Sequence, residues 1–234
     1  MKGSQGMIGI IGAMADEVNG LKFVMSNVLI ETVSSVDFFL GKLCGINVVV
    51  AESGVGKVNA AVAAQTMILK YNTDYVIFIG VAGGLHDALK IGDVVIASSV
   101  VEHDMDTTPL GDPPGYITGL DRVYIDCDAR LADILERCAR ETGLNTLRGT
   151  IASGDQFIAD DDTRNRLKNM FNAYAAEMEG ASVGHVCAMN GVKFAVLRTI
   201  SDTADSSSHI DFPTFCKMAA ENAIKVIKAS ITQI

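Results

Sequence analysis

The chain has 234 residues, of which 49% are hydrophobic and 20% are charged, a composition that excludes an intrinsically disordered protein and allows one or two domains. With 19 Lys and Arg against 28 Asp and Glu, the net charge of −9 argues against a nucleic-acid partner, because phosphate backbones repel an acidic surface. The longest apolar run, Tyr75–Leu85, is well short of the roughly 20 residues that span a bilayer, which excludes a membrane-spanning protein.

Short apolar segments alternate with helical patterns along the whole chain. This alternation predicts an α/β fold with a mostly parallel sheet covered by helices on both faces. The predicted strands are Met7–Gly12, Leu29–Leu43, Ile46–Ser53, Tyr75–Gly80, Asp93–Glu102, Gly149–Ser153, Ala173–Met178 and Lys193–Ser201. The predicted helices are Ala15–Ser26, Val58–Tyr71, Ala129–Thr142, Asp161–Asn169, Gly180–Asn190 and Phe212–Ile231. The turn Cys44–Ile46 predicts an antiparallel hairpin between the second and third strands, so we expect a mixed sheet.

No Gly-, Ser- or Pro-rich linker divides the chain, so we expect a single domain over residues 7–234. Met1–Gly6 lacks the apolar core of a signal peptide. We interpret it as a short disordered extension or a vector-derived remnant, with Met7 as a candidate natural start. The five cysteines are widely and irregularly spaced, without a CxxC pair. This pattern favours reduced thiols in a cytoplasmic protein over a disulfide framework or a zinc site.

Two segments are candidates for binding or assembly. Three of the four prolines fall in Met105–Leu120, the one long loop that we expect, and such loops are either lids and binding loops or plain surface connections. The predicted helix Val58–Tyr71 is small and apolar nearly all round. A helix without a polar face is buried, either inside the domain or against a second copy, so we expect an oligomer.

Ligands of open α/β sheets bind beyond the carboxyl ends of the strands, where this chain places glycines and acids. The glycine turn Ser53–Lys57 fits neither a phosphate-binding loop nor a dinucleotide fingerprint. Glu17, Glu179 and Asp202 follow three different strands. Each alone is explained as a helix-cap or turn residue, but three at one sheet edge predict an acidic site.

A second polar cluster, His103–Asp106, has a single imidazole and no metal-binding spacing. We therefore expect the start of a loop with satisfied polar groups there, and no metal site.

Six blocks at the strand ends resemble, in order and in register, the 5′-methylthioadenosine/S-adenosylhomocysteine nucleosidases of the nucleoside phosphorylase/hydrolase superfamily. The blocks are Gly9–Met14 with Glu17, Ser53–Lys57, Ala82–Gly84, Ser153–Asp155 with Phe157 and Ile158, Glu177–Glu179, and Arg198–Asp202. The resemblance implies a three-layer αβα sandwich around a mixed, partly barrel-like sheet. It also implies a homodimer, a small-molecule nucleoside substrate, and no metal or organic cofactor.

The resemblance further implies hydrolysis of the N-glycosidic bond of methylthioadenosine and adenosylhomocysteine, in the context of methionine salvage. Asp202 would protonate adenine N7, Glu17 would activate water, and Glu179 would hold the ribose hydroxyls. The other implied substrate-binding residues are Met178 under the ribose, Phe157 and the Ile158 backbone on adenine, Ser201 holding Asp202, Met14, Val55 and Phe212 around the 5′-thio group, and Ala82 and Gly83. Val81 and Leu110 depart from the family pattern, which has serine in several relatives and frequently an aromatic residue at these places.

The chemistry independently suits these residue types. An adenine anion is a poor leaving group, so cleavage needs an acid, while carboxylates stabilise a positively charged ribose and a base takes a proton from water. Three alternatives remain open from the sequence. A purine nucleoside phosphorylase would need arginines for phosphate, and only Arg198 lies at a strand end. A futalosine-type nucleosidase would differ at the 5′ end, and a nucleoside-binding protein would not need the set of acids.

Overall fold

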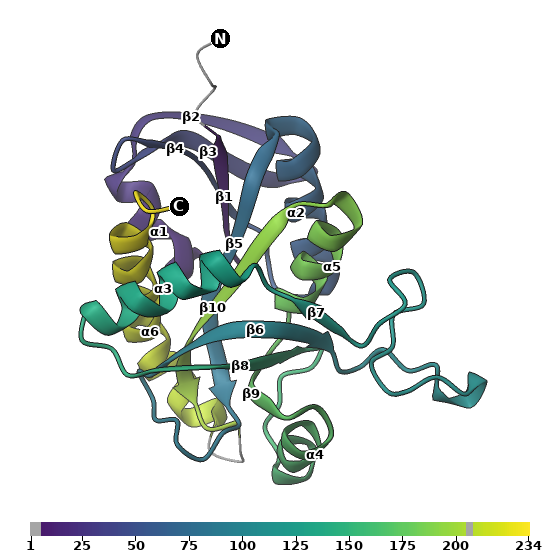
Figure 1. Ribbon diagram of the computed structural model, residues 1–234. Coiled ribbons are helices and arrows are strands. Elements are labelled where there is room, and N and C mark those ends of the chain that lie inside the picture. Colours follow the sequence, from purple (N-terminus) through teal and green to yellow (C-terminus); the bar gives the residue numbers. More distant parts are fainter. Residues whose placement is uncertain (1–5, 205–207) are drawn as a thin grey trace.

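The computed structural model describes residues 6–204 and 208–234, without the side chains of residues 208–214. Its strands, labelled as in Figure 1, are β1 (Met7–Gly12), β2 (Ser26–Val33), β3 (Val36–Leu43), β4 (Ile46–Glu52), β5 (Thr73–Gly84), β6 (Val94–Glu102), β7 (Tyr124–Asp126), β8 (Thr146–Ser153), β9 (Ala173–Glu177) and β10 (Lys193–Asp202). Its helices are α1 (Ala15–Val24), α2 (Lys57–Tyr71), α3 (Ala129–Glu141), α4 (Asp161–Phe171), α5 (Gly180–Asn190) and α6 (Ser208–Ser230), with a short 3₁₀ helix at Thr108–Leu110. The predicted N-terminal extension lies outside the described residues except for Gly6.

Part of the sheet closes into a ring, in agreement with the mixed, partly barrel-like sheet expected from the resemblance. Around the ring, β5 is followed by β10, β6, β8 and β9, and β9 returns to β5 through a short antiparallel pairing at Gly83 and Gly84. From β5 the sheet continues outwards through β1, β4 and β3 to β2. Because β1, β4, β5 and β10 are mutually parallel, their carboxyl ends lie at one edge.

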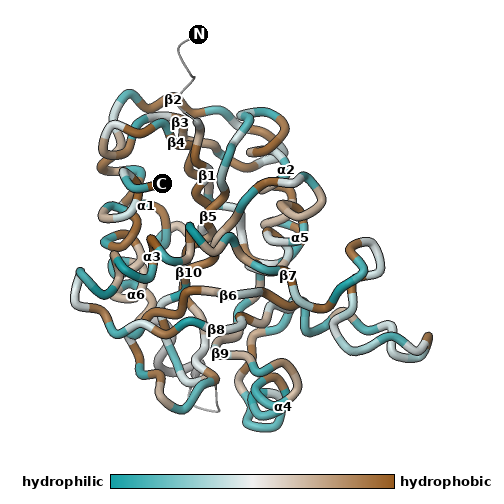
Figure 2. Tube along the Cα trace, viewed as in Figure 1, coloured by the Kyte–Doolittle hydropathy of each residue, from teal (hydrophilic) through white to brown (hydrophobic). Residues whose placement is uncertain are grey.

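Helices cover both faces of the sheet, which confirms the predicted three layers (Figure 1). On one face α1, α3 and α6 pack around apolar side chains such as Val18, Leu135 and Ile227. On the other face α2 and α5 pack against each other around residues such as Ala63 and Val183. The middle strands β1 and β5 are largely hydrophobic along their length (Figure 2), as expected for strands buried on both sides.

Local sequence signals fix where the helices begin and end. Asp128 and Asp160 precede α3 and α4, and each side chain accepts a hydrogen bond from an N–H group of the first turn, which would otherwise lack a partner. α2 and α4 end at Asn72 and Asn172, which adopt the left-handed conformation with φ of 52° and 47°. Asparagine tolerates this conformation better than most residues.

Apart from shifts of a few residues at the ends of elements, the structure differs from the predicted elements at two places. The single strand predicted over Leu29–Leu43 is wrong, because a turn at Ser34 and Ser35 (φ 52° and 62°) splits it into the hairpin of β2 and β3. The sequence also does not predict β7, because three residues are too few to show an alternating pattern. The hairpin predicted at Cys44–Ile46 is confirmed, since β3 and β4 pair antiparallel on either side of it.

Two features of the surface bear on assembly. α2 buries Ala60, Ala64 and Met67 completely, but it exposes Val58 and Leu69 by 73% and 69%. Burial within the chain therefore accounts for one face of this helix only. The loop between β6 and β7 projects from the body of the molecule (Figure 1). Within the described ranges, no helix has both the length and the apolar composition needed to cross a bilayer.

Candidate active site

A cavity of about 210 Å³ opens where several strand ends meet. β1, β5 and β10 are parallel and bring Glu17, Gly83 and Asp202 to one edge. The expectation that Glu179 follows a strand at that same edge is wrong, because β9 runs antiparallel to β5. Glu179 reaches the cavity because the ends of β5 and β9 overlap at Gly83 and Ala176, where the ring closes.

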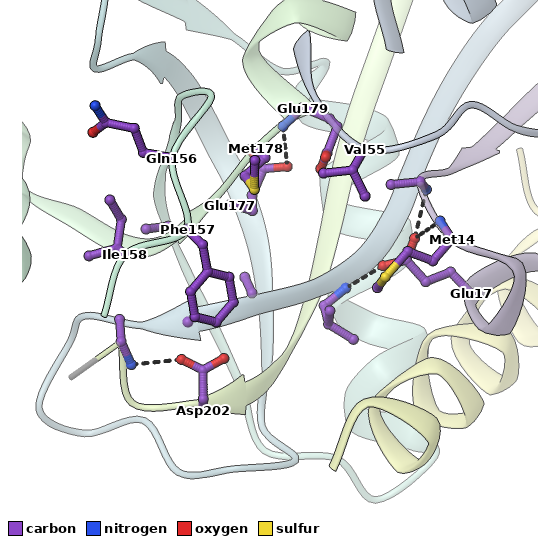
Figure 3. A pocket seen from close by; sticks show the side chains of 16 residues that line it. Met14, Glu17, Val55, Gln156, Phe157, Ile158, Glu177, Met178, Glu179 and Asp202 are labelled. Atoms are coloured by element: carbon purple, nitrogen blue, oxygen red, sulfur yellow. Dashed lines mark hydrogen bonds between the residues drawn. The ribbon is translucent and has the colours of Figure 1, made fainter. Parts of the chain in front are cut away.

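Most of the site residues named from the sequence meet in this cavity (Figure 3). Those that line it are Met14, Glu17, Val55, Ala82, Gly83, Phe157, Ile158, Met178, Glu179 and Asp202. Ser201 is fully buried directly behind Asp202, and the side chain of Phe212 lies outside the described residues. Figure 3 shows Phe157 beside Asp202 at one end, Glu17 and Met14 at the other, and Glu179 near Val55 between them.

Glu17 lies in the first turn of α1 with a side chain that is only 2% exposed. Its Oε2 accepts hydrogen bonds from the N–H groups of Ala13 (2.6 Å) and Met14 (2.9 Å), and its Oε1 accepts one from Val81 (3.0 Å). The residue therefore caps its helix, the ordinary role of an acid at this position, and also faces the cavity. Burial raises the pKa of Glu17, although Arg198 and the N–H groups act in the opposite direction.

Asp202 ends β10 and is 2% exposed. The N–H of Ala204 donates to its Oδ1 (2.8 Å) and the hydroxyl of Ser201 donates to its Oδ2 (2.9 Å). Ala204 holds this N–H in place with a left-handed backbone, φ 52°. The carboxyl group is thus fixed on both sides before any ligand arrives.

Three buried carboxylates surround one buried guanidinium. Arg198 is 1% exposed and its Nη2 forms an ion pair with Oε2 of Glu177, while Oε2 of Glu179 lies 3.7 Å away. The guanidinium carbon also lies 4.1 Å from the centre of the Phe78 ring. Nε and Nη1 of Arg198 find no acceptor among the residues that the structure describes, so these two nitrogens can donate to a ligand or water.

The charges of this cluster do not balance, since Glu17, Glu177 and Glu179 face a single Arg198. Burial and the neighbouring Glu177 raise the pKa of Glu179 to about 8, against the opposing effect of Arg198. The N–H of Gly56 donates to Oε1 of Glu179 (2.8 Å). At neutral pH Glu179 therefore retains a proton that an exposed glutamic acid would have lost.

This retained proton predicts a pH-dependent effect of Glu179→Gln on stability. Between the ordinary glutamate pKa of 4.5 and about 8, the folded chain binds more protons at residue 179 than the unfolded chain. The contribution of Glu179 to the free energy of unfolding therefore falls as pH rises through this window. Gln cannot ionise, so the difference in that free energy, variant minus parent, should grow in favour of the variant from pH 5 to pH 8. Urea unfolding at both pH values measures it, and a pH-independent difference would contradict the assignment.

The rest of the cavity wall is apolar. Phe157 is 49% exposed at the mouth, and Ile158 beside it is buried. At the opposite end Met14 packs against Val81, Cys216 and Ala219. The cavity therefore offers a flat aromatic surface at the Asp202 end and a small apolar pocket at the Glu17 end.

The sequence analysis does not predict the roles of Glu177 and Arg198 in this cluster. One signal in the sequence indicates a buried ion pair: Arg198 directly follows the apolar run Phe194–Leu197 within a predicted strand. A fully buried arginine requires carboxylate partners. Which carboxylates these are depends on the closure of the ring, and the sequence does not show this.

The cluster His103–Asp106 is only partly as expected. Asp104 and Asp106 accept hydrogen bonds from Lys57 and from the Thr108 N–H, respectively. The prediction of satisfied polar groups is wrong for His103, whose ring nitrogens are buried without a partner in the described part of the chain. Burial lowers the pKa of His103, so the ring stays neutral.

Comparisons with known proteins agree with this geometry. A family model described as the phosphorylase superfamily matches residues 7–232. The 5′-methylthioadenosine/S-adenosylhomocysteine nucleosidase of Bacillus subtilis (strain 168) is 39% identical over 227 residues, which cover 94% of this chain and 98% of that protein. The nucleosidase of the same name from Neisseria meningitidis, solved with methylthio-immucillin-A, has a TM-score of 0.94 at 34% identity, covering 97% of this chain and 99% of that one.

A third relative carries a different name. Futalosine hydrolase of Helicobacter pylori strain 26695 has a TM-score of 0.94 at 34% identity, covering 98% of this chain and 99% of that one. The family model and the relatives span almost the whole sequence. The chain therefore belongs to the phosphorylase superfamily and, within it, to the family of 5′-methylthioadenosine/S-adenosylhomocysteine nucleosidases.

Proposed function

We propose that the protein hydrolyses the N-glycosidic bond of 5′-methylthioadenosine and S-adenosylhomocysteine and releases adenine. One observation carries this proposal: the carboxyl groups of Asp202, Glu179 and Glu17 lie at separate places around one small cavity. A nucleoside has a base, a ribose and a reacting carbon that joins them. The base needs a proton donor, the ribose hydroxyls need a hydrogen-bond acceptor, and the water that attacks the carbon needs a base.

At the base end, Asp202 would transfer a proton to N7 of adenine while Phe157 stacks on the ring. The proton changes the leaving group from an anion to a neutral base, which lowers the barrier to C–N cleavage. Ser201 and the Ala204 N–H keep the carboxyl group oriented towards the cavity.

In the middle of the cavity, Glu179 would accept hydrogen bonds from the ribose 2′- and 3′-hydroxyls, with Met178 beneath the sugar. The carboxylates around Arg198 would also stabilise the positive charge that develops on the ribose as the bond breaks. Met14 and Val55 would contact the 5′-thio group.

The attacking water would lie at the Glu17 end. Oε1 of Glu17 and Nη1 of Arg198 approach each other over Gly80, where any side chain would collide with both. A water molecule held by both groups would accept a hydrogen bond from Arg198 and give a proton to Glu17.

The same electrostatics argue against phosphorolysis. Arg198 already faces three carboxylates, so a phosphate dianion next to the reacting carbon would meet a net negative charge. We therefore expect adenine release from methylthioadenosine in phosphate-free buffer, with free methylthioribose as the other product. A strict requirement for phosphate, or a sugar 1-phosphate product, would restore the phosphorylase.

Futalosine is the second candidate substrate, because the relative from Helicobacter pylori is a futalosine hydrolase. Its cleavage uses the same acid and water, and the difference lies at the 5′ end. Comparing kcat/KM for methylthioadenosine, adenosylhomocysteine and futalosine in one assay ranks the three.

We further infer that residues 7–234 act as one domain in a homodimer in the cytoplasm, in the context of methionine salvage. The exposed apolar side chains of α2 and Leu110, which is 83% exposed at the tip of the projecting loop, support an interface with a second copy. Free thiols at all five cysteines are consistent with a reducing compartment.

A further inference from the structure

Outside the cavity, a ring of three hydrogen bonds joins three distant segments of the chain. Nζ of Lys57 donates to Oδ1 of Asp104 (2.7 Å), the N–H of Asp155 donates to Oδ2 of Asp104 (2.9 Å), and the N–H of Lys57 donates to Oδ1 of Asp155 (2.8 Å). Asp104 follows β6, Asp155 follows β8, and Lys57 begins α2.

Asp155 and Lys57 are each next in sequence to residues at a different part of the cavity. Asp155 is directly followed by Gln156, Phe157 and Ile158, which line the cavity at its Asp202 end. Lys57 is directly preceded by Gly56, whose N–H donates to Oε1 of Glu179. The ring therefore links the loop that would contact adenine to the carboxylate that would hold the ribose.

The ring also provides a hydrogen-bond acceptor for the first turn of α2, which its own preceding residue cannot provide. The residue that precedes this helix is Gly56, which has no side chain to accept an N–H bond from the first turn. Asp155 provides both the acceptor and a negative charge favourable to the helix dipole, from 98 positions along the chain. Next to it, the ring of His103 packs so closely on Gly154 that a Cβ there would lie 2.6 Å from Cε1.

Lys57 places a cation among the acids of this region, and His185 contacts one of them, with its Nδ1 2.9 Å from Oε1 of Glu102. Its Nζ lies 3.3 Å from Oε2 of Glu102 as well as 2.7 Å from Oδ1 of Asp104, and these side chains are 10–21% exposed. Although burial favours neutral acids, the contacts with Lys57 help to hold the pKa of Asp104 below its usual value, and the contacts with His185 and Lys57 do the same for the pKa of Glu102. Without this cation, charged carboxylates would face one another.

We propose that Lys57 and Asp104 are positioning residues that fix the adenine-contacting loop, residues 154–158, relative to Glu179. This inference rests on the proposed function, since it assigns the loop to adenine. Neither residue touches the substrate; both act through Asp155 and Gly56. Because Asp202 and Glu17 are not attached to the ring, loosening it should weaken binding more than it slows the chemical step.

The test compares Lys57→Met with Lys57→Arg and with Lys70→Met. Lys70 is the matched control: it lies at the other end of the same helix and also forms an ion pair, with Glu31 at 2.6 Å. We expect Lys57→Met to raise KM for methylthioadenosine about tenfold with kcat within about threefold, because charge-assisted contacts hold the loop. Lys57→Arg should recover most of the loss, and Lys70→Met should match the parent.

The pattern of KM and kcat separates positioning from simple destabilisation. A variant that is merely less folded has fewer active molecules, so its apparent kcat falls while its KM stays the same. An unchanged KM in Lys57→Met therefore overturns the proposal. If Lys57→Met does not fold, Asp104→Asn decides in the same way, because it keeps the shape and removes the charge that Lys57 needs.

A binding measurement distinguishes failure of this inference from failure of the proposed function. If the parent protein binds adenine in calorimetry but releases none from nucleosides, the hydrolase assignment fails, and the adenine Kd of Lys57→Met still tests the ring. We expect that Kd to be about tenfold weaker than in the parent and in Lys70→Met. An equal adenine Kd in all three proteins would refute the role of the ring.

Discussion

Replacing Asp202 by asparagine should lower the turnover of methylthioadenosine by roughly 10²–10⁴-fold while substrate binding survives. Asn has the same shape, and its amide can preserve the contacts of this position. The carbonyl oxygen can accept from the Ala204 N–H, and the NH₂ group can donate to Ser201 Oγ or to adenine N7. What is lost is a proton that can be transferred. Single-turnover kinetics and a separate binding measurement give the two quantities.

A matched variant distinguishes the acid from the base. Glu17→Gln should also slow turnover, because it disables the attacking water and leaves the leaving group unaffected. A substrate whose leaving group departs without N7 protonation should rescue Asp202→Asn and leave Glu17→Gln slow. Near-parental turnover of Asp202→Asn on methylthioadenosine would disprove the mechanism at its central step.

The second large effect is expected from a single methyl group at residue 80. A Cβ on Gly80 would collide with Oε1 of Glu17 and Nη1 of Arg198, and would lie 2.9 Å from Cδ of Glu17. Three N–H groups hold the Glu17 carboxylate, and Arg198 is fully buried, so neither group has room to retreat. Gly80→Ala should therefore displace the carboxylate and exclude the water, lowering kcat by about 10²-fold.

Ile79→Val is the control for this variant. Its side chain points to the other face of β5, into the apolar core with Leu21 and Leu197. The loss of one methylene there should cost about 0.5–1.5 kcal/mol of stability and leave kcat unchanged. Adenine binding should persist in Gly80→Ala, because Asp202 and Phe157 lie at the far end of the cavity. A kcat of Gly80→Ala within threefold of the parent would refute the water site.

The sequence predicts those parts of the fold and site that depend on local pattern. Apolar runs locate the long strands, with β2 and β3 merged into one, and helical patterns locate the six helices. Glu17 and Asp202 could be placed at one edge because each directly follows a parallel strand. The hairpin at Ser34 and Ser35 escaped prediction because apolar and β-branched residues continue on both sides of it, without a glycine or proline to mark the turn.

The remaining features depend on contacts between residues far apart in the chain. The orientation of β9 follows from the closure of the sheet into a barrel, and no local sequence pattern predicts this closure. The same holds for the partners of Arg198 and for the link between Lys57 and Asp155. These contacts depend on tertiary packing. A single sequence shows which residues need a charged or polar partner, but not which residue that partner is.

The position of β10 has a consequence for synthesis of the protein on the ribosome. Among the strands that the structure describes, β10 is made last, yet it lies between β5 and β6, which are made much earlier. Until residues 193–202 emerge, both strands have an open edge that can pair with other chains. Arg198, Ser201 and Asp202 arrive on this same strand. A nascent chain therefore gains the strand that closes the barrel and the proton donor together, and a translation product that stops before residue 193 has neither.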